Sequence, residues 1–204
     1  MHIFSSLKNN GMKKLLALLL FFPALCGYSQ KWEKNYEFVD NCVCGLSKVE
    51  KDGKVGYVNK NGVEVIKPQY TDGLTYNEGY TAVKMEGKWK YLDSTGKAIT
   101  EAVFDDALNF NGGLAAVSKD NLFGYINKTG QIVIPFQFAN ANSFSEGLAS
   151  ASDAKGLWCY IDNKGSWVIK PMYNFANAFA NGEGRVMKGD KILYIDKQNK
   201  TLHE

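Results

Sequence analysis

Residues 45–78 read GLSKVEKDGKVGYVNKNGVEVIKPQYTDGLTYNE, and residues 79–112 repeat the layout as GYTAVKMEGKWKYLDSTGKAITEAVFDDALNFNG. Further copies begin at Gly113, Gly147 and Gly182, so five units of 34 to 35 residues follow one another. A fixed period of this length is typical of repeat proteins, in which each unit buries its apolar face only by stacking on its neighbours. The period therefore predicts a single repeat domain.

Each unit contains three segments with the pattern of a β-strand. The first alternates in polarity, as in residues 80–85, and the second is apolar on both faces, as in residues 123–126. Residue pairs such as Asp52-Gly53 and four-residue stretches such as NKNG favour tight turns between the strands. Prolines 68, 135 and 171 close the third strand, because proline cannot donate to a ladder. We predict an all-β fold of five tandem three-stranded antiparallel units, with a loop between units.

Aromatic and Asx residues recur at fixed places in the units. We expect the rings to pack between units; they are Tyr70, Phe104, Phe138 and Tyr173 at one place and Tyr76, Phe110, Phe144 and Phe179 at another. We expect the recurring Asx side chains to cap turns, since calcium would need several acids in one loop; they are Asn59, Asp93, Asn127, Asp162 and Asp196.

The repeat register also predicts how the array ends. Residues 36–45 align with residues 70–79, so that Gln30 falls at the repeat position of Glu64 and Glu204 at that of Lys67. The N- and C-terminal segments therefore have the form of complementary half units. Their pairing would close a propeller-like ring and leave no exposed strand edge. An open β-solenoid is the alternative.

Residues 12–29 have the layout of a secretory signal peptide, with Lys13 and Lys14 before the apolar run 15–25 and small residues after it. We predict cleavage before Gln30, which leaves residues 30–204 as a secreted or periplasmic domain, with translation starting at Met1 or Met12. The alternative is a lipid anchor at Cys26, although Leu25 stands where a lipoprotein signal has Gly or Ala. The run is shorter than the roughly 20 residues needed to cross a bilayer, so we expect no stable membrane span.

The charge balance excludes one class of partner. Residues 1–29 hold three of the 24 basic residues and none of the 21 acidic ones, so the predicted mature domain has no net charge. Nucleic-acid binding needs a basic surplus, and we expect none.

The stretches KWKYLDSTGKAI (residues 88–99), LFGYINKTGQIVIP (122–135), LWCYIDNKGSWVIKP (157–171) and FSEGLA (144–149) resemble the bacterial WG-containing repeat family. The resemblance covers the predicted mature chain and implies an envelope or secreted repeat protein of no established activity. No unit keeps an intact Trp-Gly pair, and the Trp position holds Val55, Trp89, Phe123, Trp158 and Ile192. Exchange among apolar residues indicates a packing role.

The sequence offers little chemistry. His2 and His203 lie near the two ends, which excludes histidine-dependent nucleophiles and histidine zinc sites from the body of the fold. Disulfides from Cys42 or Cys44 to Cys159 are both possible in an exported protein. The pair Asp105 and Asp106 would suit a glycosidase, but other units carry loop residues at this place. We therefore predict no enzyme, no cofactor and no metal.

These observations favour an exported non-catalytic module for binding or scaffolding in the cell envelope, with an envelope protein or glycan as partner. A carbohydrate-binding module with exposed aromatic rings is the second hypothesis, and a glycoside hydrolase is the third. Residues that differ between units are the candidate ligand contacts, namely Tyr76, Trp167, Met172 and Arg185. We expect Trp167 to be the most exposed aromatic of these.

Overall fold

The computed structural model describes residues 31–101 and 103–204. The predicted signal peptide of residues 12–29, its cleavage before Gln30 and the alternative anchor at Cys26 lie outside these residues. In the described part of the chain, no helix is long and apolar enough to cross a membrane.

The described residues form one short 3-10 helix and five antiparallel sheets. The helix is η1 (Glu33–Asn35). The first sheet contains β1 (Phe38–Val39), β2 (Leu46–Lys51), β3 (Lys54–Asn59) and β4 (Glu64–Tyr70). The second contains β5 (Asp72–Gly73), β6 (Tyr80–Met85) and β7 (Lys88–Asp93). The third contains β8 (Asp106–Ala107), β9 (Leu114–Lys119), β10 (Leu122–Asn127) and β11 (Ile132–Phe138). The fourth contains β12 (Asn140–Ala141), β13 (Ala149–Ser152), β14 (Trp158–Ile161) and β15 (Trp167–Tyr173). The fifth contains β16 (Phe175–Ala180), β17 (Glu183–Lys188), β18 (Lys191–Ile195) and β19 (Thr201–His203).

The all-β repeat fold is confirmed, and each sheet gains a strand from the segment predicted to be a loop. In the second sheet, isolated β-bridges from β7 to Ala98 and Phe104 replace the last strand. The added first strand has two residues in the first four sheets and six in the fifth. It fits because a small residue lies where it meets the preceding sheet. A Cβ on Gly73, for example, would lie 2.5 Å from the Tyr57 hydroxyl.

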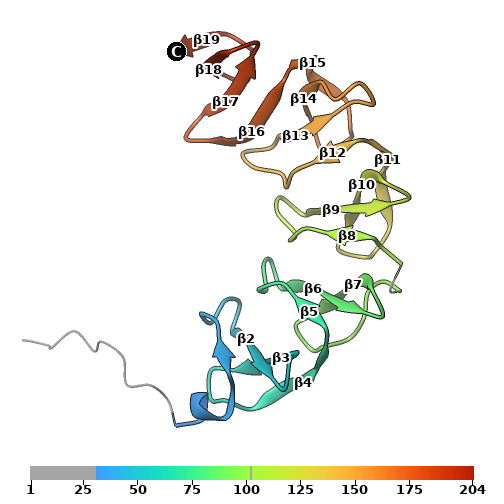
Figure 1. Cartoon of the computed structure of the whole chain (residues 1–204), viewed down its shortest axis with the longest axis vertical. Helices are drawn as coiled ribbons and strands as arrows, with labels where there is room; N and C mark the ends of the chain where they lie inside the picture. Colours follow the sequence, from blue (N-terminus) through green and yellow to red (C-terminus); the bar gives the residue numbers. More distant parts are fainter. Residues whose placement is uncertain (1–30, 102) are drawn as a thin grey trace, which may run out of the picture.

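The sheets follow one another along an open arc, with the first sheet and the fifth at opposite ends (Figure 1). Four strands in sequential order match the blades of β-propellers, so the fold is propeller-like. The predicted pairing of terminal half units does not occur among the described residues, where β1 pairs with β2 of its own sheet and β19 with β18. Each terminal sheet has its own outer strands, and the array corresponds to the open alternative.

The apolar core lies between consecutive sheets, at contacts that we call joints one to four. The cluster of joint three, for example, combines Tyr125, Ile134 and Phe138 of the third sheet with Phe144 and Ile161 of the fourth. The predicted packing of the recurring rings is confirmed. A tyrosine of one sheet meets an aromatic ring of the next edge to face, with centroids 5.0, 5.1, 5.0 and 4.7 Å apart in the pairs Tyr57–Tyr76, Tyr91–Phe110, Tyr125–Phe144 and Tyr160–Phe179.

The same four tyrosines, which we call the joint tyrosines, also cross each joint by a hydrogen bond. Each hydroxyl donates to a backbone carbonyl of the following sheet; the acceptors are Leu74 (2.7 Å), Leu108 (2.6 Å), Asn142 (2.9 Å) and Asn177 (2.7 Å). Burial raises the pKa of all four hydroxyls. Each joint therefore combines apolar burial with one directional polar contact.

Glutamate side chains cap backbone amides across joints two and four, whereas at joint one the Asp40 carboxylate accepts a hydrogen bond from the Thr75 hydroxyl. Glu78 accepts hydrogen bonds from the amides of Gly112 (2.8 Å) and Gly113 (3.0 Å) in the next unit. Glu146 accepts one from the amide of Gly182 (3.1 Å) in the same way. At joints one and three the corresponding residues are Cys44 and Gly112, which cannot make this contact.

The predicted turn caps are confirmed. The Asp93 side chain accepts hydrogen bonds from the amides of Thr95 (2.9 Å) and Lys97 (3.0 Å), and each of the other recurring Asx residues accepts the equivalent pair. Their side-chain oxygens are thus occupied by turn amides.

Candidate functional site

A repeated group of exposed apolar side chains lies on the last strand of three sheets. We call Val65, Ile132, Val133, Trp167 and Val168 the last-strand surface. All five side chains are exposed, Ile132 at 55%. They lie at the start of β4, β11 and β15, which are edge strands of their sheets. Scattered exposed apolar residues are ordinary, but a pair repeated on β11 and β15, with one further residue at the same place on β4, is a candidate contact surface.

Each of these edges is also protected against uncontrolled pairing. Pro68, Pro135 and Pro171 lie within the strands, and each strand pairs with irregular register to its neighbour. Proline and local irregularity are common ways to prevent strand-to-strand aggregation. The edges therefore offer side chains more readily than backbone hydrogen bonds.

Trp167 is the exposed aromatic residue that the sequence predicted. Its side chain is 44% exposed, and its ring lies against Phe138 of the preceding sheet with centroids 5.7 Å apart. Glu64 holds the same position in the first sheet and accepts a hydrogen bond from the Tyr36 hydroxyl at 3.2 Å. This position therefore contacts the aromatic of the preceding unit, while the outer face of the indole remains accessible.

The other three candidate contacts do not form one site with Trp167. Tyr76 is a correction, because it is 1% exposed and belongs to joint one, where its hydroxyl donates to the carbonyl of Asp93. Met172 is exposed on β15, and its sulfur lies 3.6 Å from the Asn199 side chain. Arg185 is half-buried on β17, in a different sheet.

Arg185 belongs to a charged outer face of the fifth sheet. Glu183 and Arg185 stand where the third sheet has Leu114 and Ala116, which are buried in joint three. Glu183 lies 3.2 Å from the His203 imidazole. Charged residues on the outer face are typical of the last unit of a repeat array.

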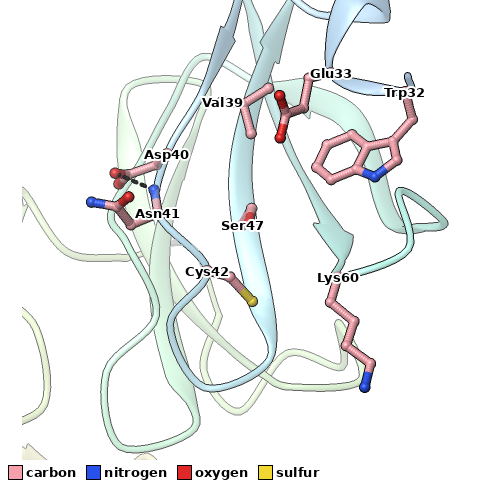
Figure 2. Close-up of a pocket in the computed structure, with 8 residues that line it drawn as sticks. All are labelled: Trp32, Glu33, Val39, Asp40, Asn41, Cys42, Ser47 and Lys60. Atoms are coloured by element: carbon pink, nitrogen blue, oxygen red, sulfur yellow. Dashed lines mark hydrogen bonds between the residues drawn. The ribbon is translucent and has the colours of Figure 1, made fainter. Parts of the chain in front are cut away.

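A small pocket opens at the other end of the arc. It encloses about 280 Å³ between Trp32 and Glu33 on one side and Asp40, Cys42 and Ser47 on the other (Figure 2). Cys42 occupies the place of the joint rings Tyr76, Phe110, Phe144 and Phe179. The pocket therefore lies where later units place a ring against the preceding sheet.

The predicted disulfides are not formed. Cys42 and Cys44 are exposed in the first unit, and Cys159 is buried in the fourth sheet. The Cys159 thiol lies 2.9 Å from the carbonyl of Ala151, and burial raises its pKa to about 12. A thiol in this state is a poor nucleophile, so Cys159 acts as a small core residue.

The acidic pair Asp105 and Asp106 serves turns. Asp105 pairs with Lys88 and accepts a hydrogen bond from the amide of Asp120 at 2.8 Å, and the bond from Lys88 is the main cause that lowers its pKa. Asp106 accepts from the amide of Ala107 at 2.8 Å. A glycosidase acid needs a raised pKa, so this geometry does not favour that role. No group of three or more metal-binding side chains occurs among residues 31–101 and 103–204.

Sequence reasoning missed the hydrogen-bonding role of the joint tyrosines. The signal was available, since tyrosine recurs at positions 57, 91, 125, 160 and 194 while its neighbours vary between units. A hydroxyl retained in a buried slot indicates a hydrogen-bond partner. The small pocket at Cys42 could also be inferred from the missing ring.

Several known structures share the arrangement of sheets. Hsv2p of Kluyveromyces lactis aligns with a TM-score of 0.52 and 12% identity, over 80% of this chain and 61% of that chain. Hsv2 of Kluyveromyces marxianus aligns with a TM-score of 0.51 and 12% identity, over 80% and 62%. A eukaryotic initiation factor aligns with a TM-score of 0.53 and 9% identity, over 82% and 56%. This chain thus covers less than two thirds of each, and at such identity the likeness concerns the fold alone.

A comparison with curated proteins gave no match. The family model described as WG containing repeat matches residues 56–89, 91–123, 123–153 and 158–191, which together are more than half of the chain. The chain therefore belongs to the family of WG-containing repeat proteins.

Proposed function

We propose that the chain is an exported, non-catalytic module that binds or scaffolds another protein of the cell envelope. The observation that carries the proposal is the last-strand surface. Exposed apolar side chains recur there at the same place on β4, β11 and β15 of one curved array. An extended array of this kind offers one partner several equivalent contacts.

The chemistry of the surface favours a protein partner. Valine and isoleucine at these positions suit an apolar protein surface, and Trp167 is the kind of anchor that dominates protein interfaces. The strand prolines limit backbone pairing, so the partner is recognised through side chains. The proposal of export rests on the layout of residues 12–29. The proposed non-catalytic role rests on the local hydrogen bonds of Asp105 and Asp106 and on the burial of Cys159.

A capture experiment tests the proposal. The mature chain, immobilised, is incubated with detergent-solubilised envelope proteins of the source cell, and Trp167→Ala with Val168→Ser serves as the variant. We expect a discrete protein to be retained by the wild type and reduced at least tenfold by the variant. Phe175→Ala is the matched control, because Phe175 is a similarly exposed aromatic outside the last-strand surface.

Other outcomes would contradict it. Capture that Phe175→Ala reduces as much as the Trp167 variant would indicate nonspecific adhesion. Turnover of a glycoside, ester or peptide that is lost in both Asp105→Asn and Asp106→Asn would overturn the non-catalytic role.

A carbohydrate-binding module is the second candidate, and the accessible indole of Trp167 favours it. Binding to a glycan array that Trp167→Ala abolishes and Val168→Ser leaves unchanged would support this candidate over protein binding, because sugar stacking needs the ring alone.

A further inference from the structure

The fifth sheet presents one half of a joint. Tyr194 on β18 holds the repeat position of the joint tyrosines, but its hydroxyl donates to no carbonyl within the part of the chain that the structure describes. Instead His203 stacks on its ring with centroids 4.3 Å apart. Ile192 beside it is 42% exposed, whereas Val55 and Trp89 at the same repeat position are buried. This face keeps the tyrosine and the neighbouring apolar residue of a joint face, although Glu183 and Arg185 replace two of its apolar residues. No sheet packs beyond it among the described residues.

The first sheet presents the other half. The Asp40 carbonyl holds the repeat position of the carbonyls that accept from the joint tyrosines. Ser47 holds the position of Thr81, whose hydroxyl lies 3.0 Å from the Tyr57 hydroxyl across joint one. Both residues line the pocket in Figure 2, so that a group arriving from outside can reach them.

Lys60, which also lines this pocket, is a further part of the joint face on the first sheet. It holds the position of Lys128 and Lys197, which both reach back to the preceding unit. The Lys128 ammonium lies 3.1 Å from the Glu78 carboxylate, and that of Lys197 donates to the Glu146 carbonyl at 2.7 Å. Lys60 lacks such a contact because no unit precedes its own among the described residues.

The chain segments at the two ends also complement one another. A Cβ on Gly62 would meet the Trp32 ring, as one on Gly96 would meet Ile66 of the preceding sheet. Residues 32–36 therefore lie where a preceding sheet would end its last strand. In the fifth sheet, β19 (Thr201–His203) holds the matching part of that strand.

From these contacts we propose that the fifth sheet of one copy docks head to tail on the first sheet of a second copy. Tyr194 donates to the Asp40 carbonyl of that second copy, and Lys60 reaches the Asn181 carbonyl. Trp32 and His203 share one repeat position, so docking displaces His203 from Tyr194. Because the two surfaces differ, repetition of the contact produces a larger ring or a filament. The inference uses the ends of the arc and does not depend on the last-strand surface.

A disulfide trap tests the contact directly. Across joint three, a Cβ on Gly112 would lie 3.4 Å from the Cβ of Phe144, close to the separation in disulfides. Asn181 and Cys42 hold these two positions at the ends of the arc. Asn181→Cys in a Cys44→Ser background should therefore form disulfide-linked dimers and longer species under mild oxidation. The matched control adds Cys42→Ser to these two substitutions and should form no disulfide between residues 42 and 181.

Sedimentation of the unoxidised mature chain provides a second measurement. We expect the mass to rise with concentration, and Tyr194→Phe to weaken association about threefold to tenfold. Cys42→Phe restores the joint ring and should tighten association about twofold to tenfold. Ile132→Ser, on the last-strand surface, should leave association unchanged.

Three results would overturn the proposal. The first is a trapped disulfide found only within single chains, which would mean that the arc closes on itself. The second is a chain that stays monomeric at every concentration and forms no trapped dimer. The third is association that neither Tyr194→Phe nor Cys42→Phe alters, which would place the contact elsewhere.

Discussion

Removal of one joint hydroxyl should weaken the fold measurably. Tyr91 is fully buried, and its hydroxyl donates to the Leu108 carbonyl at 2.6 Å. Tyr91→Phe keeps the ring and its edge-to-face contact with Phe110, so that the substitution isolates the hydrogen bond. Leaving a buried acceptor without its donor costs about 1–3 kcal/mol. At about 2–4 °C per kcal/mol for a domain of this size, the melting temperature should fall by about 2–12 °C.

Tyr194→Phe is the matched control, because Tyr194 has the same repeat position and donates to no carbonyl among the described residues. Its free energy of unfolding should stay within about 0.5 kcal/mol of wild type, as for a surface change. Urea unfolding followed by circular dichroism and by tryptophan fluorescence measures both variants, and coincidence of the two curves checks that one transition is observed. These measurements are made at low protein concentration, where head-to-tail docking contributes little. Equal losses in the two variants, or no loss in Tyr91→Phe, would refute the assignment of the hydrogen bond.

Three further predictions concern the same joints. Phe144→Ala should cost about 3–5 kcal/mol in a urea titration, the usual range for emptying a buried ring site; a loss below about 0.5 kcal/mol would place the ring at the surface. Glu78→Ala should cost about 1–2 kcal/mol more than Glu86→Ala, because both residues have positive φ but only Glu78 caps amides of the next unit; equal costs would argue against that cap. Burial raises the pKa of the joint tyrosines, so the folded chain keeps protons that the unfolded chain releases above about pH 10. Stability should therefore fall as pH rises past about 10, and Tyr91→Phe should reduce the slope by about 1.4 kcal/mol per pH unit; an unchanged slope would contradict this assignment.

The repeat pattern was sufficient to predict most of the fold. Period-two alternation and Asx-Gly turns each have a local physical cause, so the strands and turns of residues 45–66 could be predicted. The prediction that proline closes the third strand was wrong, because β4 continues through Pro68 to Tyr70 as an edge strand. The short strands such as β8 could not be predicted, because two residues carry no periodicity. They form only when Ala107 pairs with Val117 of its own sheet.

Whether the array closes into a ring could not be predicted from the sequence, for a different reason. Register alone shows that the ends are complementary, but it does not show whether they meet. That depends on the small angle between successive sheets, which side-chain packing in each joint determines. Tyr76 was predicted to contact a ligand because later units have phenylalanine at its repeat position. This prediction was wrong, since its hydroxyl forms a hydrogen bond within the core.

The glutamate caps occur at every second joint, so they tie the sheets together in pairs. Glu78 and Glu146 tie joints two and four, and Asn77 and Ser145 add side-chain bonds to the next carbonyl at the same two joints. The mechanical units are therefore pairs of sheets, the second with the third and the fourth with the fifth. Joint three lies between them and has one longer side-chain hydrogen bond, from the Ser143 hydroxyl to the Asn109 carbonyl at 3.5 Å. When the two ends of the arc are pulled apart, the sheets should therefore separate first at joint three.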